Sequence, residues 1–366
     1  MDANGKAHYL TQEECKIIKG VAIILMLMNH LWFFTDRIPG TLKYLFSIQG
    51  ESLLLILGCF GEICVSTFFF LSGYGSGIKY ADKPYNVLSK VKRTYFGYWK
   101  VFLIFIPIGF LFFSHQDIYC ADAYVCRIYA NFNIVECILN FVAFISTYNR
   151  EWWFLRYYLI LIILFVPIRA LVRKMSAINC IAVVVFIELC LVMINGFFIT
   201  ELWPHGNEIN YHMISMLCFP IGVIAAKNHL LDKLSRLIVK LPVKWLITII
   251  LTIAIIFLRD YVFGTIVDIV VVPVMIVFWK SSFPDIALIR RALLMLGEHS
   301  MNIWLLHSFF CYYYEAVSKS ILFFAYGVPA LLVLIVYSFG ASVLVNRFWE
   351  LVGKLKLIKG SVSQDQ

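Results

Sequence analysis

Residues 17–34 read IIKGVAIILMLMNHLWFF, an almost uninterrupted apolar stretch. A helix needs about 20 apolar residues to cross a bilayer, and about 17 can suffice. The stretch is longer than the apolar core of a signal peptide, and no small-residue cleavage site follows it. Thr11 and Glu14 precede it at the spacing of a capping box. We therefore expect a membrane-spanning helix that starts near Thr11.

The rest of the chain has the same character. Of its 366 residues, 61% are hydrophobic and only 14% are charged, whereas an ordinary soluble domain has about 25% charged residues. This composition excludes a water-soluble enzyme, a disordered chain and a nucleic-acid-binding protein. We attribute the net charge of +9 to orientation in a membrane. The ten cysteines form no C-x-x-C pair and the histidines show no ligand spacing, so we predict no metal site.

The hydropathy pattern predicts an all-α polytopic protein with about ten transmembrane helices. Placing both termini in the cytoplasm assigns 24 of the 31 Lys and Arg residues to the cytoplasmic side. An eleventh crossing at 131–150 would reverse the sides of all later loops and weaken this Lys and Arg bias. We therefore interpret that segment as re-entrant or interfacial. The protein would be a multi-pass plasma (inner) membrane protein, with one domain at 1–359 and a polar tail at 360–366. The expected spans are 17–34, 52–72, 95–113, 152–168, 178–199, 213–226, 245–258, 262–279, 300–316 and 321–345.

Lys19 and His30 are the first candidates for chemistry. They are eleven residues apart, which on a helix is three turns plus about 20°, so both lie on one face about 16 Å apart. An imidazole deep in a membrane is a functional candidate, although a structural hydrogen bond and a snorkelling lysine are the alternatives. Asp36 lies about 120° off the His30 face, so we expect it to be solvated. The residue that orients His30 would come from Glu62, Glu188, Asp268 or His307.

A second candidate site follows the glycine-rich segment FFFLSGYGSG at 68–77. Glycines at alternate positions let backbone N–H groups point at an anion. With the basic residues that follow, Ser72 and Gly73 are candidates to bind a multiply phosphorylated cofactor. The alternative is a plain helix end followed by a basic cytoplasmic loop. The basic candidates are Lys90, Lys92 and Arg93.

Two further segments carry polar residues beside aromatic ones. Glu151, Trp152, Trp153 and Arg156 combine a carboxylate, an arginine and rings, which suits a sugar, although an aromatic belt at the outer interface explains the rings equally well. His307 lies two turns inside the span at 300–316. We take these five residues as candidates for binding a substrate.

Taken together, these pieces resemble the acyltransferase type 3 family of integral-membrane acyltransferases, over essentially the whole chain. The family's Arg-x10-His pattern corresponds to Lys19 and His30, with lysine replacing arginine. An aspartate often found in relatives corresponds to Ser66, and Phe96 stands where the family has a second arginine. The other matching segments are Phe69–Gly73 (or Phe68-Phe69 with the full spacing), Lys92-Arg93, Trp153-x-Leu155 and Ser300-x-x-Ile303-Trp304-Leu305-Leu306-His307.

The resemblance implies transfer of an acyl group, commonly acetyl from acetyl-CoA, to a hydroxyl of a cell-surface or lipid-linked polysaccharide. Lys19, Lys92 and Arg93 would meet the CoA phosphates, and His30 would act as general base or, as a variant, carry the acyl group. The partners would then be membrane lipids, acyl-CoA and a glycan, without nucleic acid. A transporter or flippase of a lipid-linked sugar is the main alternative, and a degenerate relative with a structural role is a third.

Overall fold

The apolar run near the N-terminus forms one long helix. In the computed structural model, α1 spans Gln12–Met28 and continues as a π-helical turn, η1 (Asn29–Phe33). The predicted capping box is confirmed, because the Thr11 hydroxyl accepts from the Glu14 N–H while the Glu14 carboxylate accepts from the Thr11 N–H. The structure describes residues 8–48, 50–119, 125–194, 212–238, 240–259, 264–282 and 286–362.

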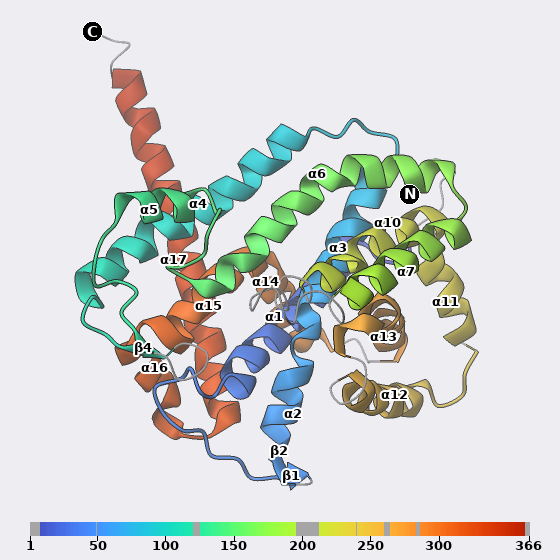
Figure 1. The fold of residues 1–366 in the computed structure, drawn as a ribbon, viewed down its shortest axis with the longest axis horizontal. Helices are drawn as coiled ribbons and strands as arrows, with labels where there is room; N and C mark the ends of the chain where they lie inside the picture. Colours follow the sequence, from blue (N-terminus) through green and yellow to red (C-terminus); the bar gives the residue numbers. More distant parts are fainter. Residues whose placement is uncertain are drawn as a thin grey trace.

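Helices make up most of the described chain (Figure 1). The two small antiparallel hairpins lie at the periphery, β1 (Ser47–Ile48) with β2 (Glu51–Ser52) and β3 (Ile118–Tyr119) with β4 (Val125–Cys126). The remaining elements are α2 (Leu53–Phe60), α3 (Ile63–Lys79), α4 (Val87–Phe112), α5 (Ile134–Phe141), η3 (Arg150–Trp152), α6 (Trp153–Lys174), α7 (Ala177–Ile194), α10 (Cys218–Asn228), α11 (Leu230–Ile238), α12 (Lys244–Leu258), η6 (Gly264–Val267), α13 (Asp268–Ser282), α14 (Ala287–Glu298), α15 (Ser300–Ser308), η7 (Phe309–Tyr313), α16 (Glu315–Ile321), η8 (Leu322–Phe324) and α17 (Gly327–Val362).

The number of long apolar helices differs from the predicted ten spans. Within the described residues, six helices are long and apolar enough to cross a membrane, or seven if α10 and α11, which bend by 79°, form one broken span. The spans expected at 178–199 and 245–258 contain shorter apolar helices. Residues 195–199 of the first of these, and residues 262–263 of the span expected at 262–279, lie outside the described part. The six long helices are Gln12–Phe33, Leu53–Lys79, Val87–Phe112, Arg150–Lys174, Gly264–Ser282 and Gly327–Lys354.

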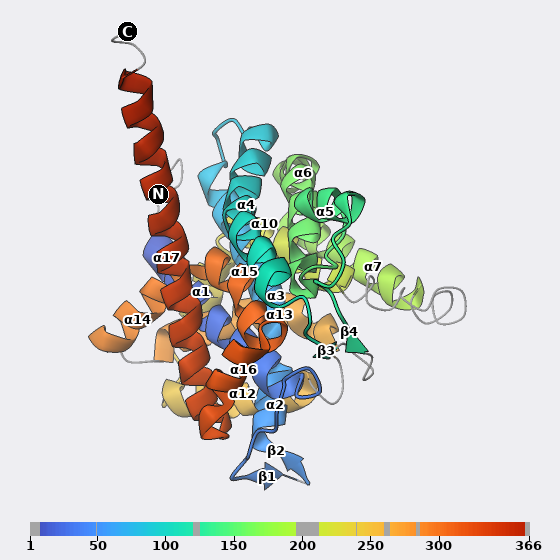
Figure 2. The same cartoon turned by 90° about the vertical axis from the view of Figure 1, so that its left-hand side faces the viewer.

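The span expected at 300–316 is replaced by three short pieces. Helix α15, the π turn η7 and the start of α16 follow one another there, and η7 is buried throughout. Helix α17 continues to Val362, past the boundary placed at 359, and projects from the bundle (Figures 1 and 2). Residues 363–366 of the predicted tail lie outside the described part.

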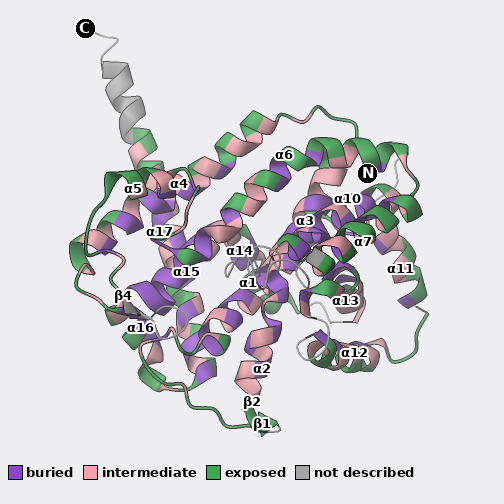
Figure 3. Ribbon diagram, in the orientation of Figure 1, coloured by how far each residue is buried: buried purple, intermediate pink, exposed green. Residues whose placement is uncertain are grey.

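The burial pattern suits a bundle that faces lipid. Buried residues gather along the helix contacts and exposed ones cover the outer faces (Figure 3). Large apolar side chains are exposed on those outer faces, among them Ile163 on α6, Ile250 on α12 and Leu344 on α17. A soluble monomer rarely exposes so much apolar surface. The structure therefore agrees with a multi-pass membrane protein.

The segment at 131–150 holds only the eight-residue helix α5. A helix of that length spans about 12 Å, too little to cross a bilayer. The carbonyls of Asn140, Phe141 and Val142 at its end accept hydrogen bonds from Tyr98, Trp99 and Tyr95 of α4, in that order. These three bonds satisfy the carbonyls that a helix end leaves open, so α5 can end inside an apolar environment.

The glycine-rich segment at 68–77 is helical, not a turn. Helix α3 continues through it to Lys79, so the expected anion-binding turn is wrong. The glycines instead allow α3 and α10 to approach closely. A Cβ on Gly73 would lie 2.0 Å from the Phe219 carbonyl oxygen, and one on Gly222 would lie 2.2 Å from that of Phe70.

This packing predicts different results for two glycines of the same helix. Gly73→Ala would force α3 and α10 apart, and we expect a loss of about 2–3 kcal/mol of stability, as overpacking in a core typically costs. Gly75→Ala is the matched control, since a Cβ there meets no atom within 4 Å and alanine favours a helix. Thermal unfolding of both variants in the same detergent checks this. Equal unfolding temperatures for the two variants would contradict the packing role of Gly73.

Candidate active site

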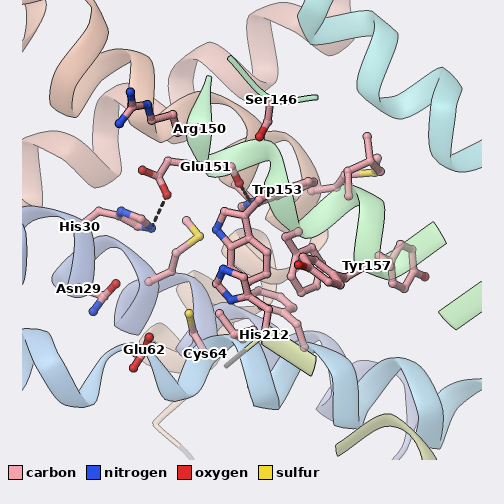
Figure 4. Close-up of a pocket in the computed structure, with 18 of the residues that line it drawn as sticks. Asn29, His30, Glu62, Cys64, Ser146, Arg150, Glu151, Trp153, Tyr157 and His212 are labelled. Carbon is pink, nitrogen blue, oxygen red and sulfur yellow. Dashed lines mark hydrogen bonds and ion pairs between the residues drawn. The ribbon is translucent and has the colours of Figure 1, made fainter. Parts of the chain in front are cut away.

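A cavity of about 1110 Å³ opens between α1, α3, α4, α6 and α15. Lys19 and His30 both line it, as the eleven-residue spacing predicts. Small-molecule sites typically have volumes of about 300–1,000 Å³, so this one has room for a large ligand or for two ligands. Figure 4 shows His30 and Glu151 facing each other across one part of the cavity.

The His30 ring is oriented by a tyrosine. Its Nδ1 lies 3.2 Å from the hydroxyl oxygen of Tyr312, and the Tyr312 O–H donates to the backbone carbonyl of His30. Because the hydroxyl has a single proton, the second bond requires an N–H on Nδ1. In the neutral ring Nε2 then carries the lone pair. The arrangement thus presents the basic nitrogen of His30 to the cavity.

Both partners in this bond lie in π-helical turns. His30 belongs to η1 at the end of α1, and Tyr312 belongs to η7 after α15. Such turns are rare and occur frequently at functional sites.

Glu151 lies beside the basic nitrogen. Its Oε2 is 3.7 Å from Nε2 of His30, and its Oε1 is 3.3 Å from Nη1 of Arg37. The Arg37 guanidinium also lies over the Phe34 ring, 4.0 Å from its centroid. A carboxylate in this position stabilises an imidazolium when His30 takes up a proton.

Five hydrogen bonds fix the turn that carries Glu151. The Asn149 side chain and the Ser308 hydroxyl bond to each other, and the Arg150 N–H donates to the Tyr313 hydroxyl. The Trp304 indole donates to the Glu151 carbonyl, and the Trp152 indole donates to the Leu305 carbonyl. All of these partners lie on α15 or η7, so the bundle holds Glu151 against His30.

His307 lies next to His30 but behind the cavity wall. The centroids of the two rings are 4.6 Å apart, and His307 is fully buried. Its Nδ1 lies 2.7 Å from the Trp304 carbonyl, so Nδ1 carries the proton. Its Nε2 is buried and has no hydrogen-bond partner within the described chain.

The other predicted substrate residues separate into two groups. Trp153 and Arg156 line the cavity, where Trp153 stacks on His212 with ring centroids 3.6 Å apart (Figure 4). Trp152 is only 2% exposed and packs in the core, so the structure does not bring it into the cavity.

The predicted cofactor residues separate in the same way. Ser72 and Lys19 line the cavity. Thr94 and Tyr158, which were not among the predicted residues, line it as well. Gly73 packs against α10, as described above. Lys90 is half-buried and Lys92 and Arg93 are exposed on the first turns of α4, outside the cavity lining.

Of the four residues expected to orient His30, none makes the hydrogen bond that Tyr312 makes. Asp268 forms a buried pair with Arg259 and accepts a hydrogen bond from Ser66. Glu62 lines the cavity and lies 3.6 Å from Arg259. Asp36 is exposed, as predicted.

Comparison with known families gives a match over nearly the whole chain. The family described as "Acyltransferase domain" matches residues 14–347. The chain belongs to the acyltransferase type 3 family. No curated protein and no solved structure matches it. With its long apolar helices, the protein is thus a multi-pass membrane acyltransferase.

Sequence reasoning missed two residues of this acyltransferase site. Arg37 lies in a bend beyond the end of η1 at Phe33, so helical spacing from His30 does not predict its place at the site. Tyr312 gave no signal either, because it belongs to the aromatic run 309–314, which reads like a membrane-interface segment.

Removing the Tyr312 hydroxyl tests its role as a positioning residue of the acyltransferase. In Tyr312→Phe, Nδ1 of His30 loses its partner and the ring can adopt the other tautomer. We expect kcat for acyl transfer to fall roughly tenfold, the cost of about one hydrogen bond, with KM for the acyl donor unchanged. Tyr44→Phe, at an exposed tyrosine, is the control. Unchanged kcat in Tyr312→Phe would contradict the assignment.

Proposed function

We propose that the protein transfers an acetyl group from acetyl-CoA to a hydroxyl of a cell-surface or lipid-linked polysaccharide at the plasma membrane. The family membership and the membrane-spanning helices support the general activity. The observation that carries the proposal is the orientation of His30, whose basic nitrogen faces a large cavity beside a carboxylate.

His30 acts as general base in this reaction. Its Nε2 takes the proton of the acceptor hydroxyl, and the hydroxyl oxygen attacks the thioester carbonyl carbon. The C–S bond then breaks, and the thiolate of CoA receives the proton from the imidazolium. Such a base typically contributes about 10²–10⁴-fold. Glu151 stabilises the imidazolium between the two proton transfers.

The Lys19 end of the cavity suits the CoA molecule. Lys19 lies three turns from His30 along α1, and a long thin pantetheine arm matches that separation. Ser72 and Thr94 add hydroxyl-bearing side chains to the lining of the same cavity. Lys90 precedes Thr94 by one turn of α4, so the phosphates would meet Lys90, and then Lys92 and Arg93, beyond the cavity.

The opposite end suits a sugar. Trp153, Arg156 and Trp304 line the cavity and combine rings with polar groups, and the Trp304 indole donates to the Glu151 carbonyl. His307 supports this end from behind, through the His30 ring.

Radiolabelled acetyl-CoA tests the proposed function and separates it from the transporter alternative. Purified protein in vesicles is supplied with acetyl-CoA labelled in the acetyl group and with cell-surface polysaccharide or its lipid-linked precursor. We expect label in the glycan as an alkali-labile ester. Label held by the protein after an acid quench would favour an acyl-His30 intermediate. Glycan movement across the membrane without label would contradict the enzyme and favour transport.

A further inference from the structure

Basic side chains outnumber carboxylates in the lining of the cavity. The basic residues of the lining are Lys19, Arg37, Arg150 and Arg156, and its carboxylates are Glu62 and Glu151. His30 and Arg37 both approach Glu151, whereas Lys19 lies three turns of helix from His30. The lining therefore has more positive than negative charge, and one of its cations lies beside the reacting nitrogen.

Arg37 is held rigidly and retains donor capacity. Stacking on Phe34 and the bond to Oε1 of Glu151 fix the plane of its guanidinium. Its Nε is buried and has no hydrogen-bond partner within the described chain. A buried N–H of a charged group is costly to leave unpaired, and the side chain as a whole is 21% exposed and lines the cavity from which a ligand would approach.

Arg37 and His30 contact the two oxygens of one carboxylate. An acceptor whose hydroxyl approaches Nε2 of His30 therefore has its neighbouring groups within reach of the guanidinium. Arginine binds a phosphate or a carboxylate through paired N–H donors, and it is less suited to a neutral hydroxyl.

We propose that the acceptor is anionic: it carries a phosphate or carboxylate group that Arg37 binds, with Arg150 adding to the positive field. This inference rests on the proposed function, because it specifies the substrate of the same site. It predicts that the protein distinguishes acceptors by charge as well as by sugar structure.

Matched glycosides test this by binding and by turnover. The probes are octyl glucoside, octyl glucuronide and octyl phosphoryl glucose, which are neutral, carboxylate-bearing and phosphate-bearing. Binding to protein in lipid nanodiscs is followed by the fluorescence of the tryptophans, of which Trp153 and Trp304 line the cavity. Acetyl transfer to each glycoside is measured in parallel. The variants are Arg37→Gln, Arg37→Lys and, as control, Lys43→Gln at an exposed lysine outside the cavity lining.

We expect the wild type and Lys43→Gln to bind at least one anionic glycoside about tenfold or more tightly than the neutral one. Arg37→Gln should lose this preference and Arg37→Lys should keep part of it. The better of the two anions identifies phosphate or carboxylate. Equal binding of all three glycosides by the wild type, or a preference that persists in Arg37→Gln, would overturn the inference. So would a turnover loss in Arg37→Gln that is equal for all acceptors, since Arg37 would then only hold Glu151.

The two readouts separate this inference from the proposed function. Anion-selective binding that depends on Arg37, without any acetyl transfer, would support the anion site and count against the acetyltransferase. Acetyl transfer without charge preference would do the reverse.

Discussion

His30→Ala is expected to lower kcat for acetyl transfer by about 10³-fold, which is within the range that a general base contributes. The reason is that no other described side chain presents a basic nitrogen to the cavity beside Glu151. KM for acetyl-CoA should change little, because the proposed phosphate contacts lie beyond the Lys19 end of the cavity, three turns of α1 or more from His30. Initial rates with labelled acetyl-CoA measure both constants.

His115→Ala is the control for this variant, since His115 is exposed and lies outside the cavity lining. Detergent-solubilised His30→Ala should elute as the wild type does on size exclusion, which shows that the bundle is intact. Retention of wild-type kcat in a folded His30→Ala protein would exclude the base.

Glu151→Gln is expected to lower kcat by about 10²-fold, the typical cost of removing one preorganised electrostatic contact in a transition state. The substitution keeps the size and shape of the side chain but removes the negative charge that lies 3.7 Å from Nε2 of His30. The imidazolium that forms during the reaction is then less stable. Steady-state kinetics and thermal unfolding are measured together.

Asp36→Asn is the matched control, because Asp36 is an exposed carboxylate next to Arg37. A Glu151→Gln protein with normal kcat and lowered thermal stability would show that Glu151 is structural and would remove it from the mechanism.

The sequence predicted the first helix and its face well, because both depend on local rules. Capping by Thr11 and Glu14 and the 3.6-residue period of α1 are enough to place Lys19 and His30 in one cavity. The family was also recognisable, since its motifs recur in order along the chain.

Features that depend on contacts between distant segments were not predictable. Gly73 resembles a turn residue in sequence, and only the approach of α10, with Gly222, to α3 shows that these glycines allow helix packing. The segment 300–316 is apolar enough for a span, but the structure divides it into α15, the buried turn η7 and the start of α16.

The pairing of His30 with Glu151 is the most important example. Glu151 lies more than 100 residues away and was assigned to an outer sugar site, apart from His30. The hydrogen bonds that hold its turn to α15 and η7 bring it to the imidazole. No spacing rule within one helix reveals such a contact.

The central claim is that the CoA donor and the solvent both reach Nε2 of His30 through one cavity. Diethyl pyrocarbonate, which modifies neutral imidazole nitrogens, tests it directly when His30 is followed by peptide mass spectrometry. The account predicts that His30 is modified in the free protein and that saturating CoA slows its modification at least about tenfold, with no change at exposed His115. An unreactive His30, or one that reacts equally fast with CoA bound, would contradict the claim.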